Sequence, residues 1–147
     1  NIHAGWALQY DLPLVLHTRD AMQETIDVIK TYKPKGLRGI FHCFGGTKEQ
    51  TQEIINANFL LGIGGVVTYK NSGLSDVLKD IDLNHIVLET DAPYLTTIPF
   101  RGKRNESSYL KYIAQKLADV KQITFDEVAV QTTKNAETVF QKDDLAD

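Results

Sequence analysis

The chain has 147 residues, 42% of them hydrophobic and 24% charged, which fits one globular domain; no apolar run or N-terminal segment reads as a transmembrane helix or a signal peptide. The net charge of −3 excludes a general attraction to nucleic acid, so phosphate binding would need a local cluster of cations. The one cysteine, Cys43, excludes an internal disulfide and favours a reducing compartment, so we expect a cytoplasmic protein with no membrane partner.

Four short apolar runs rich in β-branched residues alternate with segments of helical periodicity, and two further helical patterns follow the last run. The predicted strands are Leu12–His17, Leu37–Phe44, Phe59–Gly64 and His85–Asp91. Strands that alternate with helices of this length favour βα units. We therefore predict an α/β fold with about four parallel strands. Because the chain opens inside a helical pattern and without Met, we expect it to be a piece of a longer protein.

Three helix starts are predicted from capping residues. Thr47 with Gln50 forms one capping box, and Thr124 with Glu127 forms a second. Between them, Asn105 precedes a run of apolar residues at helical spacing and is the predicted N-cap of that helix.

Polar side chains fall near the C-terminal ends of three predicted strands. Alternation places His17, His42 and the pair Glu89 and Asp91 each on one face of an otherwise apolar strand. Sites in parallel α/β folds are built at this rim, because the loops that follow the strands open there. Carboxylates in an apolar core are costly, and a divalent cation is their usual partner. The coincidence of these residues predicts a metal site.

Each of these residues also has an ordinary structural interpretation. A single histidine in a strand is more often hydrogen-bonded than a ligand, Asp91 before a proline could be a turn residue, and Glu89 could pair with a base. Cys43 lies on the opposite strand face and is interpreted as packing. Gly62 and Gly64 share one face of the third strand and leave room there, which we interpret as the floor of a pocket.

Three cations lie within four residues just beyond the last predicted strand, on the same rim. Arg101, Lys103 and Arg104 could hold phosphate oxygens, and Asn105 at the following helix start would add free N–H groups. Such a segment alone is more often a solvated loop, but beside a metal site phosphate binding is the better interpretation. Arg19, after the first strand, is similarly placed, although it could equally pair with the neighbouring acid.

Five segments resemble, in order, the motifs of the TatD family of metal-dependent DNases. They are Leu12–Ala21, Gly39–Gly46, Gly62–Lys70, Leu88–Leu95 and Arg101–Glu106. The resemblance implies a partial TIM-type (β/α) barrel that hydrolyses phosphodiester bonds of DNA, often as an exonuclease. It makes His17, His42 and Asp91 metal ligands. It also implies two divalent ions, Mg²⁺, Mn²⁺ or Zn²⁺, that activate water and clamp the phosphate.

Within this picture, His17 and His42 would hold one ion, and Asp91 would hold the other or orient the attacking water as the catalytic residue. Glu89, two residues before Asp91 and deeper on the same face, would fix the geometry of the histidines or of the metal without binding the metal itself. The cations of the basic segment would contact the DNA phosphate backbone without reading its sequence.

The resemblance is incomplete, since the chain has neither the family's N-terminal His-x-His nor its bridging glutamate. A complete barrel takes about 250 residues, so we expect residues 1–147 to be the C-terminal half, with the N-terminal half absent. Four strands would form an open half-barrel or curled sheet, with two unpaired edges and an apolar interior facing water. We expect such a chain to pair with its missing half, or with itself through those edges, and to be inactive alone.

Two other functions stay open. A deaminase, lactonase or amidase could use a similar barrel and metal, although the basic segment disfavours a neutral substrate. The chain could also be a catalytically dead piece or an interaction module, because it holds only three of the expected ligands.

Overall fold

The structure, a computed structural model, describes residues 1–140; the end of the predicted 1–147 unit, residues 141–147, lies outside the described part. Its centre is a four-stranded parallel sheet whose strands follow one another in chain order. The strands are β1 (Leu14–His17), β2 (Gly39–His42), β3 (Phe59–Ile63) and β4 (Ile86–Leu88). The prediction of four parallel strands is confirmed, although each strand is shorter than its apolar run.

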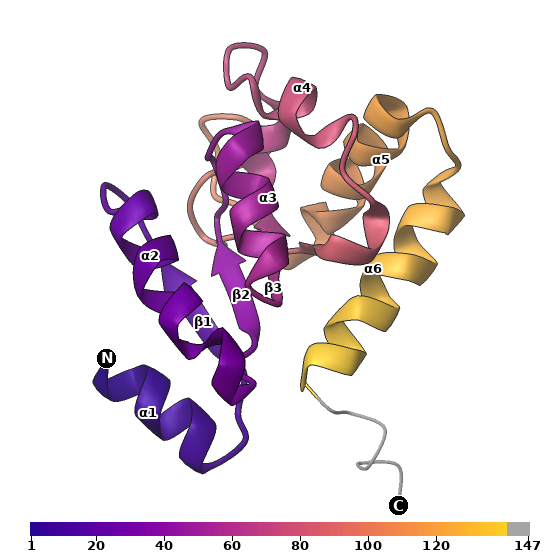
Figure 1. The fold of residues 1–147 in the computed structure, drawn as a ribbon. Coiled ribbons are helices and arrows are strands. Elements are labelled where there is room, and N and C mark those ends of the chain that lie inside the picture. Colours follow the sequence, from indigo (N-terminus) through magenta and orange to yellow (C-terminus); the bar gives the residue numbers. More distant parts are fainter. Residues whose placement is uncertain (141–147) are drawn as a thin grey trace, which may run out of the picture.

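The helices connect the strands as βα units and then extend beyond the last strand (Figure 1). The α-helices are α1 (Ile2–Gln9), α2 (Met22–Tyr32), α3 (Lys48–Asn56), α4 (Leu74–Leu78), α5 (Leu110–Lys121) and α6 (Phe125–Phe140). The 3₁₀ turns are η1 (Lys33–Lys35), η2 (Gly65–Thr68), η3 (Leu83–His85) and η4 (Ser107–Tyr109). Among the described residues, no helix is both long enough and apolar enough to cross a membrane.

Two of the three predicted helix starts are confirmed. At α3 the Gln50 backbone N–H donates to Thr47 Oγ1 over 3.2 Å, and the reciprocal bond to the Gln50 side chain is present. At α6 the Glu127 backbone N–H donates to Thr124 Oγ1 over 3.2 Å, and the Glu127 carboxylate accepts from the Thr124 N–H. The predicted N-cap at Asn105 is wrong, because α5 begins only after η4 and the Asn105 side chain bonds elsewhere.

The main core covers one face of the sheet. Strand alternation points Phe41 of β2 and Leu61 of β3 to this face, where they are fully buried against Ile26 and Ile29 of α2 and Ile54 of α3. Each such side chain contributes roughly 1.5–3 kcal/mol relative to an exposed one. This layer fixes the strands, and therefore the rim on which the polar residues sit.

The opposite face, the inner face of a barrel, is partly covered. Ile40 and Val87 are buried there in a second, small cluster with Val139 of α6. Helix α6 is held in this position by Asn135, whose side-chain amide donates over 2.8 Å to the carbonyls of Leu83 and Ile86. The expectation of an apolar interior left open to water is therefore corrected, because α6 covers the part of this face that is formed by Ile40 and Val87.

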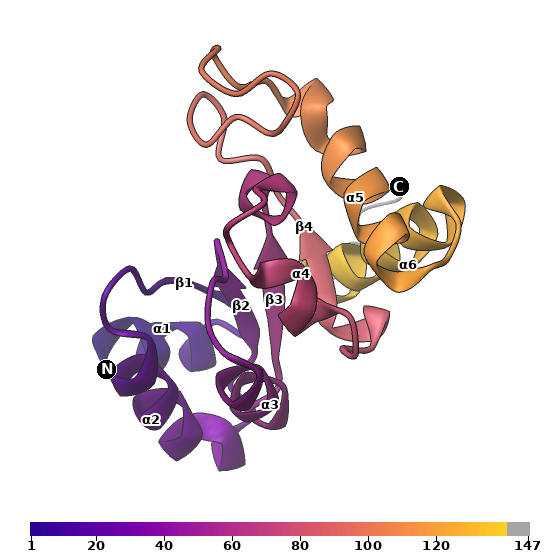
Figure 2. The same ribbon diagram turned by 90° about the horizontal axis from the view of Figure 1, so that it is seen from above.

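Within residues 1–140, neither edge of the sheet pairs with a further strand, as predicted for a half-barrel. Near β1 several large apolar side chains are exposed: Ile2, Trp6, Tyr10, Leu12 and Val15. Next to β4 an apolar groove of about 510 Å³ lies along α5 and α6, with Leu110, Ala114, Phe125 and Phe140 in its lining. Figure 2, turned by 90°, shows the four strands as a curved, open sheet.

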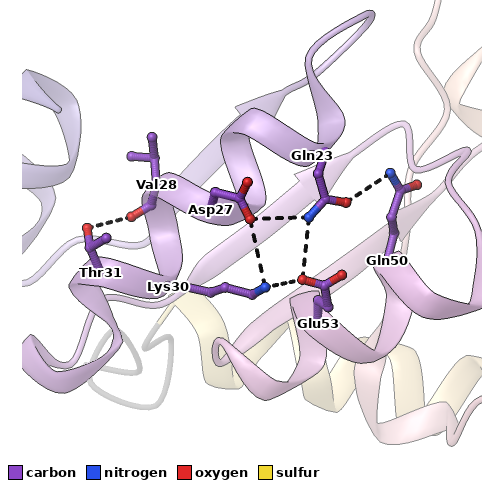
Figure 3. A network of polar contacts seen from close by, with 7 residues as sticks. All are labelled: Gln23, Asp27, Val28, Lys30, Thr31, Gln50 and Glu53. Atoms are coloured by element: carbon purple, nitrogen blue, oxygen red, sulfur yellow. Dashed lines mark hydrogen bonds and ion pairs between the residues drawn. The ribbon is translucent and has the colours of Figure 1, made fainter.

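The outer surface between α2 and α3 carries a polar network (Figure 3). Lys30 of α2 forms ion pairs with Asp27 on its own helix, at 3.8 Å, and with Glu53 of α3. The Gln23 amide donates to Asp27 over 3.2 Å and to Glu53 over 3.4 Å, and it accepts from Gln50. These groups satisfy one another and join the two helices.

Candidate metal centre

The carboxyl ends of β1 and β2 bring two histidines side by side. His17 and His42 are register partners in the parallel ladder, so their side chains leave the sheet on the same face. Their ring centroids lie 5.7 Å apart. The His17 side chain is exposed, whereas that of His42 is half-buried.

His42 also lies between two carboxylates from the segment after β4. Its Nδ1 is 2.9 Å from Glu89 Oε2, and its Nε2 is 3.0 Å from Asp91 Oδ1. A neutral imidazole carries one N–H, so it can donate to only one of these oxygens; the other contact requires a second proton or a cation.

The three side chains together form the one group in the described residues that could hold a metal ion through at least three ligand atoms. His42, Glu89 and Asp91 each offer one nitrogen or oxygen atom, and these atoms lie within 4.8 Å of one another. His17 is outside this trio, although its ring is adjacent to that of His42. Glu89, expected to stand behind the ligands, offers a ligand atom itself.

Asp91 Oδ2 is the buried polar atom that most directly fits a bound cation. In the described part of the chain it has no hydrogen-bond partner, although it is out of contact with solvent. An unpaired buried carboxylate oxygen costs free energy, and a metal ion would offset that cost. The residues present therefore fit a divalent cation on the grounds of chemistry as well as distance.

Backbone geometry at the strand ends creates this arrangement. Cys43 and Asp91 adopt left-handed conformations, with φ of 51° and 57°, which end β2 after His42 and turn the chain at Asp91. Between them, the Glu89 N–H donates to the Ile63 carbonyl over 3.1 Å, so the ladder continues far enough to fix Glu89. The Cys43 N–H in turn donates to Glu89 Oε1.

Two glycines of the neighbouring strand make room for the carboxylates. A Cβ at Gly62 would lie 2.5 Å from Glu89 Oε2, and one at Gly64 would lie 3.4 Å from Asp91 Oδ2. The prediction that these glycines leave space on this face of β3 is confirmed, and the two carboxylates occupy that space.

Burial controls the protonation of two groups at the site. Desolvation raises the pKa of Glu89 above its ordinary value, and the opposing attraction of His42 does not cancel this effect. Burial, followed by the nearby charge of Asp91, raises the pKa of the Cys43 thiol to about 12, so the thiol stays protonated at neutral pH. Cys43 is thus a poor metal ligand, although its half-buried thiol lies close enough to Asp91 and Glu89 to be affected by their charges.

The predicted phosphate-binding cations lie on the loop that follows Asp91 and that projects from the body of the molecule in Figure 2. Arg101, Lys103 and Arg104 are exposed, and within residues 1–140 no carboxylate forms an ion pair with them. Arg19 is also exposed, in the turn after β1, and it too has no ion-pair partner in that range.

Asn105 does not fit its expected role as a substrate contact. It is buried, and its amide donates to the carbonyls of Thr90 and Tyr94, the latter over 2.6 Å. Its Oδ1 accepts from the Glu106 N–H. Because its hydrogen-bonding groups are already used, Asn105 instead fixes the loop against the chain on either side of Asp91. No local sequence signal distinguished this role from that of a helix cap.

The comparisons with known proteins agree with the geometry. The family model described as TatD related DNase matches residues 2–141. An uncharacterized metal-dependent hydrolase, YabD of Bacillus subtilis (strain 168), is 43% identical over 136 residues, which cover 92% of this chain and 53% of that protein. The 3'-5' ssDNA/RNA exonuclease TatD of Erwinia tasmaniensis is 31% identical over 95% of this chain and 56% of its own length.

A solved structure is similar over the same extent. The crystal structure of YJJV, a TatD homolog from Escherichia coli k12, matches 94% of this chain and 53% of its own with a TM-score of 0.87 and 27% identity. The predicted partial TIM-type barrel is thereby confirmed, and the chain spans about half the length of these relatives. The chain belongs to the TatD related DNase family of metal-dependent hydrolases.

Proposed function

We propose that this chain contributes the carboxyl-end metal ligands and the phosphate-binding loop of a nuclease that hydrolyses phosphodiester bonds of DNA. One observation carries the proposal: the trio of His42, Glu89 and Asp91 adjoins the loop that carries the three cations. Within residues 1–140, one carboxylate oxygen of the trio is buried without a hydrogen-bond partner, and no carboxylate pairs with the cations. A metal centre that binds an anion needs both features, whereas a neutral substrate needs only the first.

His42, Glu89, Asp91 and the adjacent His17 would hold divalent ions, which we propose to be two and to be Mg²⁺, Mn²⁺ or Zn²⁺. When bound, such ions polarise the phosphodiester and lower the pKa of water. Asp91 has an oxygen available either for an ion or for orienting the attacking water, and it is the proposed catalytic residue. Glu89 holds His42 in place through the contact to Nδ1.

The loop after Asp91 that carries Arg101, Lys103 and Arg104, here called the basic loop, would bind the substrate backbone. Arg101, Lys103, Arg104 and Arg19 are exposed at the same rim and would contact phosphates without reading the bases. The exonuclease named among the relatives supports an attack from the end of a single strand, and we propose this mode for the present chain.

The complete site would need a second half of the barrel. The chain spans about half the length of its relatives. In the part of it that the structure describes, both sheet edges are unpaired and apolar side chains are exposed beside them. We propose that an N-terminal half, absent from residues 1–147, covers these edges and completes the metal centre, with self-association as the alternative. The 147 residues alone would then be inactive. We place the protein in the cytoplasm, where a single cysteine stays reduced.

The test is hydrolysis of a 5′-labelled single-stranded oligonucleotide by the protein at its natural length, with Mg²⁺, Mn²⁺ or Zn²⁺ and with chelator. We expect metal-dependent release of nucleotides from one end, lost in His42→Ala. A parallel panel of small amides and lactones covers the alternative reactions. Metal-dependent hydrolysis of that panel, with intact DNA, would refute the nuclease proposal while leaving the metal centre in place.

A further inference from the structure

The turn that follows β3 contacts the basic loop at residues 95–98, just before its cations. Thr68, the last residue of η2, accepts through Oγ1 from the Ile98 N–H over 3.0 Å, and the Thr97 hydroxyl lies 3.1 Å from the same oxygen. Gly65, at the start of η2, approaches the loop so closely that a Cβ there would lie 2.4 Å from the Leu95 carbonyl oxygen. The segment Gly65–Tyr69 therefore serves as a platform for the loop.

Tyr69 ends this platform and contacts the loop in two ways. Its hydroxyl donates to the Thr96 carbonyl over 3.0 Å. Its ring lies beneath the guanidinium of Arg101, whose Cζ is 4.0 Å from the ring centroid. The tyrosine is half-buried, so its ring is a fixed surface, whereas Arg101 is exposed.

This geometry orients Arg101 without using its hydrogen-bond donors. A guanidinium over an aromatic face is held by the ring quadrupole, and its N–H groups remain free at the edge. Within residues 1–140 no carboxylate competes for them. A long, exposed arginine held in this way loses less conformational entropy when it binds an anion.

We propose that Tyr69 is a positioning residue that preorganises Arg101 to bind a phosphate of the nucleic-acid backbone. The inference rests on the proposed function, because it takes the substrate to be a phosphodiester chain held next to the trio of His42, Glu89 and Asp91. The ring supplies the positioning, and the hydroxyl contact to Thr96 secures the loop that carries Arg101.

The experiment measures binding of a fluorescent single-stranded oligonucleotide by the protein at its natural length, in chelator so that no hydrolysis occurs, as a function of salt. The variants are Tyr69→Leu, Tyr69→Phe, Arg101→Gln and the double variant of Tyr69→Leu with Arg101→Gln. Tyr32→Leu is the matched control, since Lys35 lies over the Tyr32 ring at 5.2 Å in the same kind of pair, but before β2 and thus at the other end of the sheet.

We expect Tyr69→Leu to weaken binding roughly two- to fivefold, and to reduce the slope of log K against log salt by up to about 0.7, the value for one phosphate contact on a single strand. Arg101→Gln should reduce the slope similarly, and the double variant should be no weaker than Arg101→Gln alone. Tyr69→Phe keeps the ring and should keep the slope. Tyr32→Leu should bind like the unchanged protein.

The outcomes separate the inference from the proposed function. If Tyr69→Leu and Tyr69→Phe weaken binding equally with an unchanged salt slope, or if the losses from Tyr69→Leu and Arg101→Gln add, Tyr69 has only a structural role and the inference is overturned. The same holds if Arg101→Gln binds normally. If the unchanged protein neither binds the oligonucleotide nor cleaves it with metal, the proposed function itself fails.

Discussion

Two groups of polar residues differ in how their charges are paired: the network between α2 and α3, and the candidate metal centre at the strand ends. In the network, Lys30 lies between Asp27 and Glu53, so each charge has an opposite charge beside it (Figure 3). At the centre, two carboxylates converge on one imidazole, and Asp91 Oδ2 has no partner in the described residues. The first arrangement is complete by itself, whereas the second leaves a carboxylate oxygen to which a cation could bind.

The two regions also differ in backbone conformation. The network sits on regular helices, whereas the metal centre is formed where Cys43 and Asp91 leave the sheet with positive φ. Conformations of this kind cost free energy and persist where the surrounding structure holds them. The outer network therefore rests on ordinary helical backbone, whereas the conformations at Cys43 and Asp91 carry a cost that the surrounding structure must offset.

The sharpest way to break this comparison is to remove the shared imidazole. His42→Ala should weaken Mn²⁺ binding by roughly 100-fold or more, because two carboxylates lose the group that lies between them. Titration calorimetry measures the change. His85, which lies in η3 before β4 and so at the opposite end of the sheet, provides the control variant His85→Ala. Equal affinities for the two variants would remove His42 from the ligand set.

A second test fills the space under Glu89. Gly62→Ala places a Cβ 2.5 Å from Glu89 Oε2 and 3.1 Å from the Phe41 carbonyl oxygen, so the carboxylate must move. We expect a loss of about 1–2 kcal/mol in the free energy of unfolding, together with weaker metal binding. Urea unfolding and metal titration provide the two measurements.

The matched control for that substitution is Gly5→Ala in α1. No atom lies within 4 Å of a Cβ built there, and alanine favours a helix by roughly 0.5–1 kcal/mol over glycine. Gly5→Ala should therefore stabilise the chain and leave metal binding unchanged. If Gly62→Ala bound metal as tightly as Gly5→Ala, the space under Glu89 would have no role in the site.

The third prediction concerns pH. Because burial raises the pKa of Glu89, the folded, metal-free chain keeps a proton that the unfolded chain loses above the ordinary value of 4.5. The stability contributed by this group is complete below that value and falls as the pH rises through the raised pKa. Glu89→Gln should remove this fall, as measured by urea unfolding in chelator between about pH 4 and pH 7.

Metal reverses the sign of that dependence. A cation binds the carboxylate form of Glu89, so binding releases the proton and affinity should increase with pH over the same window. Parallel stability profiles for Glu89→Gln and the unchanged chain would contradict the assignment of a raised pKa to Glu89.

The smallest effect is expected in the outer network. Lys30→Ala removes both ion pairs of an exposed side chain, and such pairs contribute less than about 1 kcal/mol because water screens them. Metal affinity should not change. A larger loss of stability, or any loss of metal binding, would show that the outer layer and the rim are coupled.

The sheet could be predicted from the sequence because its signal is local. Each strand is an apolar run between helical patterns, and alternation placed His17 on a face of its own strand and His42 on a face of its own strand. The register pairing shows that both lie on one face of the sheet. The strand ends were less predictable. The run 37–44 continues past His42, but the left-handed backbone at Cys43 ends β2 there, and a pattern of apolar residues does not report φ.

The candidate site divides in the same way. Asp91 and His42 follow from strand position, and Gly62 from its face. The position of Glu89 beside His42 depends on how far the β3–β4 ladder continues, and the burial of Asn105 depends on how the loop after Asp91 folds back. Neither is encoded by neighbours in the chain.

By itself, the sequence determined the parallel βα order, the rim on which the polar residues collect and the family to which the chain belongs, because periodicity and motif order are properties of neighbouring residues. Only the tertiary structure decided that Val139 of α6 packs on Ile40 and Val87 at the inner face of the sheet. The same is true of the two carboxylates that face the nitrogens of His42, and of the Tyr69 ring beneath Arg101. These contacts join residues far apart in the chain, and their distances are set by how whole layers pack.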